Sequence, residues 1–359
     1  ISRMLNNTSR PEKGRVLLVG NFLSKIIKGN KSFSETLADQ LEETGWSVIR
    51  VSNYLPPAAR ISDMILTAYN SRHKYQVAHV DVFSGRGFIW AEAVCQVLQW
   101  LGKPYFITLR GGRLPEFADR WPKRVRRLLK KAHTVVTPSR HIQSELSNLR
   151  SDIQYLSDAV DLRRYSFRLR KNAVPRLCWL RSFHSIYNPT MAVEALTELT
   201  AEFPMIQMEM IGPDKGDGSL RAVKDLIGRA GVSERIKIIE GISNIDVPRR
   251  IGESDIFLNT TFLESFGVSV MEAAAAGLCI ITTNVGELPY LWTEGLDALM
   301  VPPNDAAAMA KAARRILTDP RLAEHLSHNA RQKALNFSWS SVLPQWEQLL
   351  RKVGRLPSA

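Results

Sequence analysis

The sequence is poor in cysteine and has no long apolar run. Its three cysteines, Cys95, Cys178 and Cys279, lie far apart among 359 residues, unlike a disulfide framework or a zinc site. Each lies among apolar residues, so we expect buried thiols and a reducing compartment, with metal ligation or a disulfide as the alternatives. No apolar run approaches the roughly 20 residues that a membrane-spanning helix needs, which argues against an integral membrane protein.

Acidic residues are too few to balance the basic ones. Lys and Arg total 48 against 35 Asp and Glu, which gives a formal net charge of +13. Such an excess favours nucleic acid, an anionic membrane surface or phosphorylated small molecules as partners. The chain lacks zinc-finger spacing, an aromatic RNA-binding signature and a basic tail, so we expect no nucleic acid partner.

The sequence also lacks the residue patterns of a signal peptide and of a metal centre. Residues 1–15 are polar and basic without an apolar segment, so we expect a cytoplasmic protein, and a start at Ile1 favours a native terminus further upstream. No histidines and carboxylates cluster with metal-ligand spacing. Asp214 and Asp217 are too far apart to form the Asp-x-Asp pair that bridges a diphosphate through a metal, so we expect no metal.

Short β-branched runs alternate with helical spacing along the chain. The first series of strands is expected at residues 16–19, 48–51, 77–82, 105–109, 134–137 and 153–156. The second is expected at residues 177–180, 208–211, 236–239, 256–258, 280–282 and 299–301, with helices over 191–199, 220–229, 268–276 and 306–317. This alternation predicts an α/β protein with two Rossmann-like, doubly wound domains whose parallel sheets are covered on both faces.

The polar, basic segment 165–174, which ends before Pro175, predicts the linker between these domains. We expect an N-terminal domain over residues 1–168 and a second domain over 169–335. A C-terminal helical segment, 336–359, is expected to pack back toward the first domain. Ligands of open α/β sheets bind beyond the carboxyl ends of the strands, so the site is expected between the domains.

The sharpest local signal is the sequence Glu264-Ser-Phe-Gly-Val-Ser-Val-Met-Glu272, which leads into a small-residue helix that stops at Gly277. We expect Ser265 to be the N-cap of this helix and the first amides to point outward as an anion site. The two carboxylates can reach different parts of one extended ligand. Taken alone, two glutamates at this spacing are more typical of a solvated surface.

The same segment resembles the donor-binding region of the family 4 glycosyltransferases. The likeness rests on Glu264, Phe266-Gly267, Glu272, the turn Val285-Gly286 and the stretch Met300-Val301-Pro302-Pro303. Weaker matches, at Ser157-Asp158-Ala159-Val160-Asp161 and Phe337-Ser338-Trp339, extend it over most of the chain. The resemblance implies the GT-B fold, in which two Rossmann-like domains, acceptor-side and nucleotide-sugar-binding, face each other across a cleft.

The resemblance also implies an activity. It is a retaining transfer of a sugar from a nucleoside-diphosphate sugar to a hydroxyl acceptor, in glycan, glycolipid or polysaccharide synthesis, without a metal or other cofactor. Glu264 and Arg181 are implied to be catalytic, beside the transferred sugar and the diphosphate. Glu272 is implied to hold the ribose hydroxyls. The remaining donor-binding residues implied by the family are Phe266, Gly267, Val268, Gly29 and Arg110.

The loop Arg110-Gly111-Gly112-Arg113 offers two guanidinium groups and two glycines at a strand's carboxyl end, a combination suited to a phosphate or carboxylate. We therefore expect Gly111, Gly112 and Arg113, together with His184, to contact the acceptor or a phosphate. A satisfied loop histidine is the alternative for His184. The glycine-rich loop 212–218 is a weaker candidate for a phosphate cradle.

The sequence departs from the family pattern at three positions. No Lys follows Arg181 at about five residues, Arg110 stands where the family has His, and Tyr290 stands where Glu is frequent. These changes leave two alternatives open. One is a nucleotide-sugar epimerase of the same fold, and the other is a non-catalytic nucleotide-sugar-binding subunit.

The segment from Lys123 to Lys131 contains six basic residues and no acidic one. Helical spacing predicts that Trp121, Val125, Leu128, Leu129 and Ala132 face the core and leave the basic residues outside. We expect this face to contact an anionic membrane surface, peripherally and on the inner side, which fits a lipid-linked acceptor. A solvated basic face is the alternative.

Overall fold

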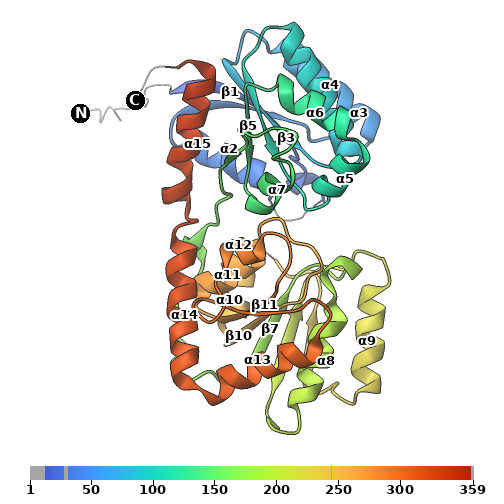
Figure 1. The fold of residues 1–359 in the computed structure, drawn as a ribbon, viewed down its shortest axis with the longest axis vertical. Coiled ribbons are helices and arrows are strands. Elements are labelled where there is room, and N and C mark those ends of the chain that lie inside the picture. The colour runs from blue at the N-terminus through green and yellow to red at the C-terminus, as the bar shows by residue number, and fades with distance from the viewer. Residues whose placement is uncertain (1–12, 28–30, 244, 357–359) are drawn as a thin grey trace, which may run out of the picture. The chain divides into compact units, whose positions relative to one another are not determined.

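The computed structural model describes residues 13–27, 31–243 and 245–356, and their contacts divide the chain into two units. The first unit comprises the residues up to Pro138, Ile142–Ser157 and the residues from Val342 onward. The second comprises Ser139–His141 and Asp158–Ser341. Each unit contains one six-stranded parallel sheet, so the expected pair of doubly wound domains is confirmed (Figure 1).

The sheet of the first unit has the strand order β2-β1-β3-β4-β5-β6. Its strands are β1 (Gly14–Val19), β2 (Trp46–Val51), β3 (Val77–Val82), β4 (Tyr105–Leu109), β5 (Thr134–Thr137) and β6 (Gln154–Tyr155). The helices are α1 (Ser24–Ile27), α2 (Phe33–Glu43), α3 (Pro57–Asn70), α4 (Arg86–Trp100), α5 (Leu114–Arg120), α6 (Pro122–Lys131) and α7 (Arg140–Glu145). The strand order reverses between β1 and β3, and such a reversal opens a crevice at the carboxyl ends of the strands.

The sheet of the second unit has the order β12-β11-β10-β7-β8-β9, which reverses between β7 and β10. Its strands are β7 (Arg176–Leu180), β8 (Gln207–Ile211), β9 (Ile236–Ile239), β10 (Ile256–Asn259), β11 (Cys279–Thr283) and β12 (Leu299–Val301). The helices are α8 (Pro189–Leu199), α9 (Ser219–Arg229), α10 (Val247–Gly252), α11 (Val268–Ala276), α12 (Leu288–Leu291), α13 (Ala306–Thr318) and α14 (Pro320–Leu335). All twelve predicted strands and the four predicted helices are confirmed, with ends that shift by one or two residues.

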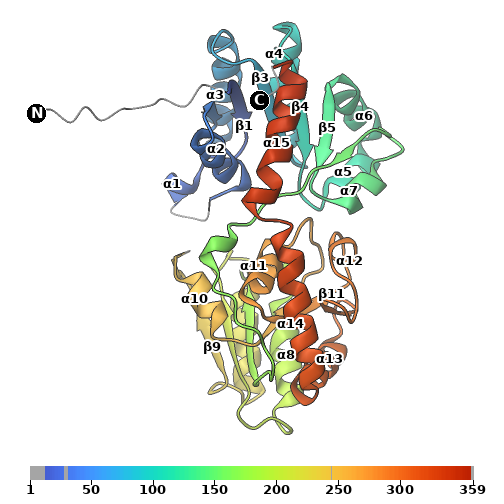
Figure 2. The same ribbon diagram turned by 90° about the vertical axis from the view of Figure 1, so that its left-hand side faces the viewer.

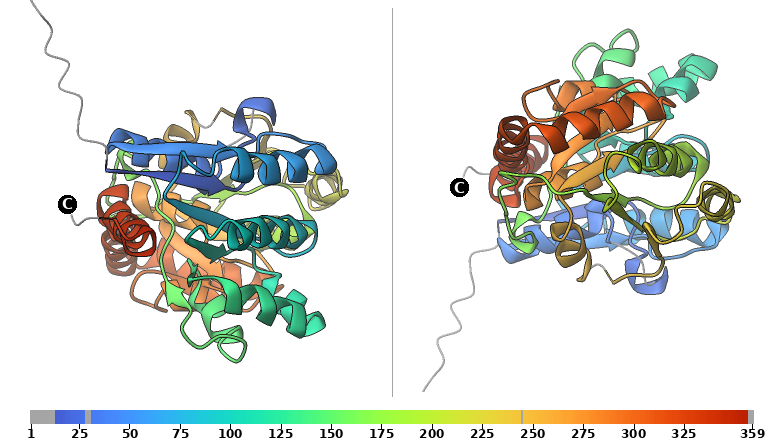
Figure 3. Two further views of the ribbon diagram at one scale, coloured as in Figure 1. Left: turned by 90° about the horizontal axis from the view of Figure 1, so that it is seen from above. Right: turned by 90° about the horizontal axis from the view of Figure 1, so that it is seen from below.

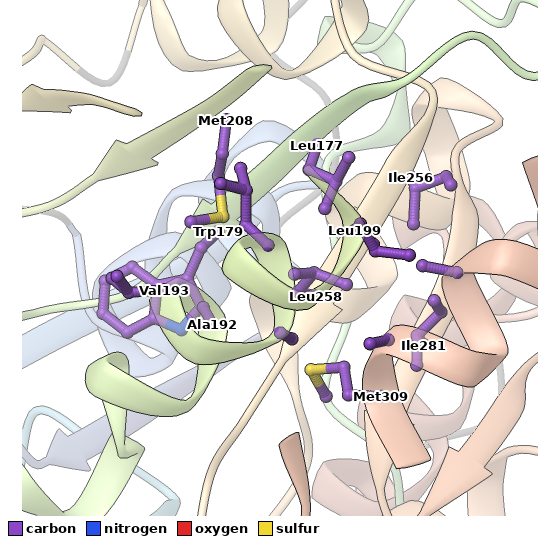
Figure 4. Packing of buried hydrophobic residues seen from close by; sticks show 14 of the residues in the cluster. Leu177, Trp179, Ala192, Val193, Leu199, Met208, Ile256, Leu258, Ile281 and Met309 are labelled. Atoms are coloured by element: carbon purple, nitrogen blue, oxygen red, sulfur yellow. The ribbon is translucent and has the colours of Figure 1, made fainter. Parts of the chain in front are cut away.

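Helices cover both faces of each sheet (Figures 2 and 3), and the buried side chains show why. In β7, Leu177 and Trp179 pack on one face, in the cluster that also contains Met208 and Leu258 (Figure 4). Cys178 points to the opposite face, into a separate buried cluster. Because successive side chains of a strand alternate in direction, apolar residues at every position require cover on both sides. The three cysteines are buried free thiols, as expected.

The segment predicted to be the linker packs closely on the second unit instead. Tyr165 and Arg170 are only 4% and 1% exposed, and the Arg170 guanidinium donates to the carbonyl oxygens of Ser254 and Ala276. A basic, polar composition is therefore compatible with burial here, since carbonyl groups satisfy the guanidinium. The contacts change from one unit to the other between Ser157 and Asp158, eleven residues before the predicted boundary.

The last helix, α15 (Trp339–Gly354), crosses the other boundary between the units, after Ser341. Within the first unit, Trp346 is fully buried and its ring lies 5.3 Å from those of Phe33 and His79. The indole N–H of Trp346 donates to the Ser157 carbonyl over 3.2 Å. The chain thus returns to complete the core of its first unit from residue 342 onward.

Candidate functional site

The loops that follow β7 and β10 meet at the strand-order reversal of the second unit. The amide of Phe262 donates to the Ile186 carbonyl over 2.8 Å, and the Thr260 hydroxyl donates to the Tyr187 carbonyl over 2.6 Å. The Trp179 indole donates in turn to the Thr260 hydroxyl over 2.9 Å. These bonds fix the two loops side by side at the carboxyl end of the sheet, where open α/β sheets bind ligands.

Arg181, from the loop after β7, forms an ion pair with Glu264, from the loop after β10. Their side chains are 20% and 6% exposed, so the pair is partly desolvated. The second Glu264 oxygen accepts from the Ser265 amide over 3.1 Å. The guanidinium also stacks over the Tyr187 ring at 4.5 Å, while its Nε is buried without a partner in the described part of the chain. Burial has the largest effect and opposes the charge of Arg181, but Glu264, Tyr187 and Glu272 together outweigh it and raise the pKa of Arg181.

The turn at Gly286 presses against Glu264. A Cβ at Gly286 would lie 2.2 Å from the Glu264 carbonyl oxygen, and the backbone there has φ of 54°, so only glycine fits without strain. The amide of the next residue, Glu287, donates to that same carbonyl over 3.0 Å. The Val285-Gly286 turn therefore holds the backbone of Glu264 in place.

Helix α11 begins next to this ion pair and has no side-chain cap. Its N-cap is Gly267, with φ of 87°, and not Ser265, so that prediction is wrong. Ser265 lies too early because the left-handed Gly267 turns the chain into the helix two residues later. The first-turn amides lack partners within the helix, and the buried Ser269 hydroxyl has none among the described residues. Uncapped donors of this kind, at the positive end of the helix dipole, can bind an anion.

Glu272 lies one turn further along α11 and accepts a hydrogen bond from the Tyr165 hydroxyl over 2.5 Å. Burial raises the pKa of Glu272, and the Tyr165 hydroxyl together with the charges of Arg164 and Arg181 partly offsets this rise. The sequence did not identify Tyr165, or Tyr187 under the Arg181 guanidinium, as site residues, because no motif or spacing marks either position. Both depend on loops that converge only in the fold.

The two carboxylates of the glycine-rich loop 212–218 accept hydrogen bonds from backbone amides. Asp214 accepts from the Gly216 amide over 2.9 Å, and Asp217 accepts from the amides of Ser185 and Ser219 over 2.7 and 3.1 Å. These backbone donors lower the pKa of Asp217, so the loop carries fixed negative charge. His184 accepts from the Ile186 amide over 3.1 Å and lies 3.8 Å from Asp217. This negative charge disfavours a phosphate, so the loop does not fit the phosphate cradle that its glycines predicted.

The first unit has its own charged pair at the strand-order reversal. Asp81, at the end of β3, accepts from the Arg110 Nε over 2.6 Å and from the Ser34 hydroxyl, and both charged side chains are less than 10% exposed. Arg110 also stacks over Phe33 at 4.5 Å. Burial works against the charge of Asp81, but Arg110 and its other partners lower the pKa of this carboxyl. The Arg110 guanidinium is thus packed inside the first unit.

The other first-unit candidates are differently placed. Gly111 has φ of 87° beyond β4, next to Gly112, and Arg113 is exposed at the N-cap of α5. Gly29 lies outside the described residues. On α6, the apolar side chains of Val125, Leu128 and Leu129 face the core as predicted.

Trp121 was also predicted to face the core, and this is wrong. Its side chain is 48% exposed, because Trp121 is the N-cap of α6 and lies before the first helical turn. Arg124 forms a bidentate ion pair with Glu92 on α4. The other basic residues of α6 are exposed: Lys123, Arg126, Arg127, Lys130 and Lys131.

No group of His, Cys, Asp and Glu side chains in the described ranges is arranged to hold a metal ion. Among the same residues, every helix is too short or too polar to cross a membrane. A cavity of about 520 Å³ lies at the amino ends of β7, β8 and β9, lined by residues that include Arg176, Gln207 and Arg235. It is at the opposite end of β7 from Arg181, so it is separate from the Arg181–Glu264 site.

Residues 169–333 match the family described as "Glycosyl transferases group 1". A D-inositol 3-phosphate glycosyltransferase of Corynebacterium efficiens is 27% identical over 164 residues, which cover 45% of this chain and 39% of that enzyme. The chain thus spans less than two thirds of the length of this relative.

Two solved structures share the fold. A sucrose-phosphate synthase of Thermosynechococcus elongatus has a TM-score of 0.77 at 19% identity, over 95% of this chain and 99% of that one. HepE of Anabaena, solved in complex with UDP-glucose, has a TM-score of 0.73 at 15% identity, over 94% of this chain and 100% of that one. These likenesses establish two Rossmann-like domains of the GT-B type.

Proposed function

We propose that the chain transfers a sugar from a nucleoside-diphosphate sugar to a hydroxyl acceptor, with retention at the sugar. The sequence of the second unit, which matches the group 1 glycosyltransferases, supports this proposal. The observation that carries this proposal is the meeting of Arg181, Glu264 and the uncapped start of α11 at the strand-order reversal. HepE, which shares the fold, has been solved with UDP-glucose, and this supports a uridine nucleotide as the first donor to test.

The site contains positive groups where the leaving diphosphate requires them. The Arg181 guanidinium and the first amides of α11 supply fixed positive potential, which stabilises the charge that develops on the leaving phosphate oxygens. The bond from the sugar carbon to the phosphate oxygen breaks as the acceptor oxygen bonds to that carbon. The acceptor proton passes to the leaving phosphate oxygen. Glu264, oriented by its ion pair with Arg181, contacts the sugar, and Glu272 binds the ribose.

Because the Arg181 guanidinium and the backbone amides at the start of α11 supply this positive potential, we propose that transfer needs no metal ion. Transfer is expected to continue in excess chelator at an unchanged rate. Complete loss of transfer, restored by magnesium or manganese, would show that the diphosphate is bound through a metal instead.

The direct test is a thermal-shift panel of nucleotide sugars followed by a transfer assay. A ligand at about 100 times its dissociation constant adds roughly 2.7 kcal/mol of stability, so a donor should raise the melting temperature visibly. Glu272→Ala should weaken binding of the sugar nucleotide and the free nucleotide alike, whereas Glu264→Ala should lower turnover more than affinity. Binding without transfer or hydrolysis, with every acceptor offered, would instead indicate a nucleotide-sugar-binding subunit.

We also propose that the acceptor is lipid-linked and that α6 contacts an anionic membrane surface. Five exposed cations lie along α6. Trp121 is exposed at its start, and Trp100, at the end of the neighbouring helix α4, is 73% exposed and stacked on Tyr69. Aromatic rings favour the interface of a bilayer, and each basic residue near an anionic surface contributes about 1 kcal/mol of binding energy.

Co-sedimentation with liposomes tests this surface. Binding is expected to anionic vesicles and not to neutral ones, and to weaken as salt rises. The variant for this test changes four α6 residues to Gln: Arg126, Arg127, Lys130 and Lys131. The matched control changes four exposed cations of the second unit to Gln: Arg221, Lys224, Arg229 and Lys237. Equal binding by both variants would contradict a role for α6.

A further inference from the structure

The segment between the two sheets brings one tyrosine onto the face of α11. The Val160 amide donates to the Phe337 carbonyl over 2.8 Å, and the Arg168 amide donates to the Ala276 carbonyl, at the end of α11, over 3.3 Å. Between these anchors, residues Leu162–Arg164 form a 3-10 turn, and the Tyr165 amide closes it on the Leu162 carbonyl over 3.1 Å. Both ends of the segment are therefore fixed to the second unit, and Tyr165 has a defined position.

The Tyr165 hydroxyl is 2.5 Å from Oε1 of Glu272. Tyr165 is 4% exposed, and in the described part of the chain it is the only hydrogen-bond donor to this carboxylate. Burial and the adjacent carboxylate raise the pKa of Tyr165, so the phenol keeps its proton and donates. A short bond to an ionised acceptor is stronger than a neutral one, so it fixes the orientation of the carboxylate.

This bond leaves the second oxygen of Glu272, Oε2, without a donor among the described residues. Each carboxylate oxygen has two lone pairs, so Oε1, which already accepts from Tyr165, is the weaker remaining acceptor for a ribose hydroxyl and Oε2 is the stronger one. Arg164, whose charge acts on Glu272, lies with its guanidinium 6.0 Å from the Tyr165 ring, so the carboxylate also has a positive neighbour. Glu272 is therefore an oriented carboxylate with one stronger acceptor oxygen, Oε2.

We propose that Tyr165 is a positioning residue for nucleotide recognition, whose hydroxyl orients Glu272 so that its remaining oxygen accepts from one of the two ribose hydroxyls. The inference rests on the proposed function, because it takes Glu272 as the ribose-binding carboxylate. It predicts unequal use of the two ribose hydroxyls, which the ribose-binding role alone does not.

The test compares UDP with its 2′-deoxy and 3′-deoxy analogues by calorimetry. In the wild-type protein, loss of one hydroxyl is expected to weaken binding about tenfold and loss of the other to have little effect, since a hydrogen bond to a charged group is involved. In Tyr165→Phe, UDP is expected to bind several-fold more weakly and the two analogues to become similar. Tyr75→Phe is the matched control, because Tyr75 is also buried but donates to the Ala68 carbonyl.

The pH dependence supplies a readout that a packing role would not change. Protonation of Glu272 removes its acceptor character, so UDP affinity should fall as pH decreases. Without the Tyr165 hydroxyl the pKa of Glu272 rises further, so this fall should begin at higher pH in Tyr165→Phe. An unchanged midpoint, together with unchanged preference between the analogues, would overturn the inference.

A double-mutant cycle distinguishes the remaining outcomes. In a Glu272→Ala background, Tyr165→Phe should cause no further loss of UDP affinity, whereas a purely structural tyrosine would cause the same loss in both backgrounds. The double variant removes both partners, so it also serves if Tyr165→Phe alone does not fold. If the wild-type protein binds none of UDP, GDP and ADP, the proposed function itself is wrong. Binding of UDP that Glu272→Ala leaves intact would remove only the ribose assignment, and this inference with it.

Discussion

Each unit has an arginine–carboxylate pair near the strand-order reversal of its sheet, yet the two pairs are differently surrounded. In the first unit, Asp81 and Arg110 are 3% and 8% exposed. In the second, Glu264 and Arg181 are 6% and 20% exposed. The first pair is therefore buried on both sides, whereas the guanidinium of the second is partly exposed.

The helices beside the two pairs differ in the same sense. Helix α2 begins with a capping box, in which Ser32 accepts from the Glu35 amide and Glu35 accepts from the Ser32 amide. Helix α11 begins at Gly267 with no side-chain cap. A capped terminus has satisfied its donors, and an uncapped one presents them to an anion. Under the proposed function, this difference in capping favours the start of α11 over that of α2 as the terminus that binds the diphosphate.

The largest expected effect is on stability in the first unit. Asp81→Ala leaves the Arg110 charge buried without its carboxylate, which should destabilise the unit by about 3–5 kcal/mol. Urea unfolding followed by tryptophan fluorescence measures it, with Asp119→Ala, at an exposed position of α5, as the control. A loss below about 1 kcal/mol would mean that the pair is not enclosed in solution.

The second prediction concerns the pair in the other unit. Arg181→Ala should lower the turnover of sugar transfer by about 100- to 1000-fold, because it removes a charge that stabilises the leaving group. Arg181→Lys should retain part of this activity. The control is Arg221→Ala on α9, where the Arg221 side chain is exposed, and this change should leave turnover unchanged. If Arg181→Ala changes only the melting temperature, the role of Arg181 is structural.

The third prediction concerns pH and the buried His79 of the first unit. Burial lowers the pKa of His79 to about 4, from about 6.5 in the unfolded chain. The unfolded state therefore binds more protons between these values, and stability should decrease by about 3 kcal/mol as pH falls from 6.5 to 4. Comparison of unfolding at several pH values in wild-type and His79→Gln protein checks this, with exposed His73→Gln as the control. An equally steep pH dependence in His79→Gln would assign the effect to other groups.

The smallest expected effect separates the two helix termini. Ser32→Ala removes the cap of α2 and should destabilise the protein by about 1 kcal/mol without affecting nucleotide binding. Gly267→Ala places a side chain at φ of 87°, with its Cβ 3.3 Å from Leu288, and should reduce nucleotide affinity as well as stability. Thermal melts with and without UDP distinguish the two results. Reduced UDP binding in Ser32→Ala would contradict the contrast between the termini.

Sequence patterns predicted most of the fold and part of the candidate site. Glu264 and Glu272 were identified as a pair because they flank a helix start in one continuous segment. Their partners were identified less completely. Arg181 was predicted only through the family resemblance, and Tyr165 was treated as part of a linker. Tyr165 and Glu272 are 107 residues apart, and no spacing rule joins them.

What the sequence determined by itself is what depends on neighbours along the chain. Short β-branched runs predicted the twelve strands and helical spacing predicted the extent of α11, because strand preference and side-chain direction both follow from local backbone geometry. The tertiary structure decided the rest: the N-cap at Gly267 in place of Ser265, the exposure of Trp121 and the enclosure of Arg110. Each of these depends on which distant loops meet a side chain, and loop conformation is set by long-range contacts that one-dimensional periodicity does not contain.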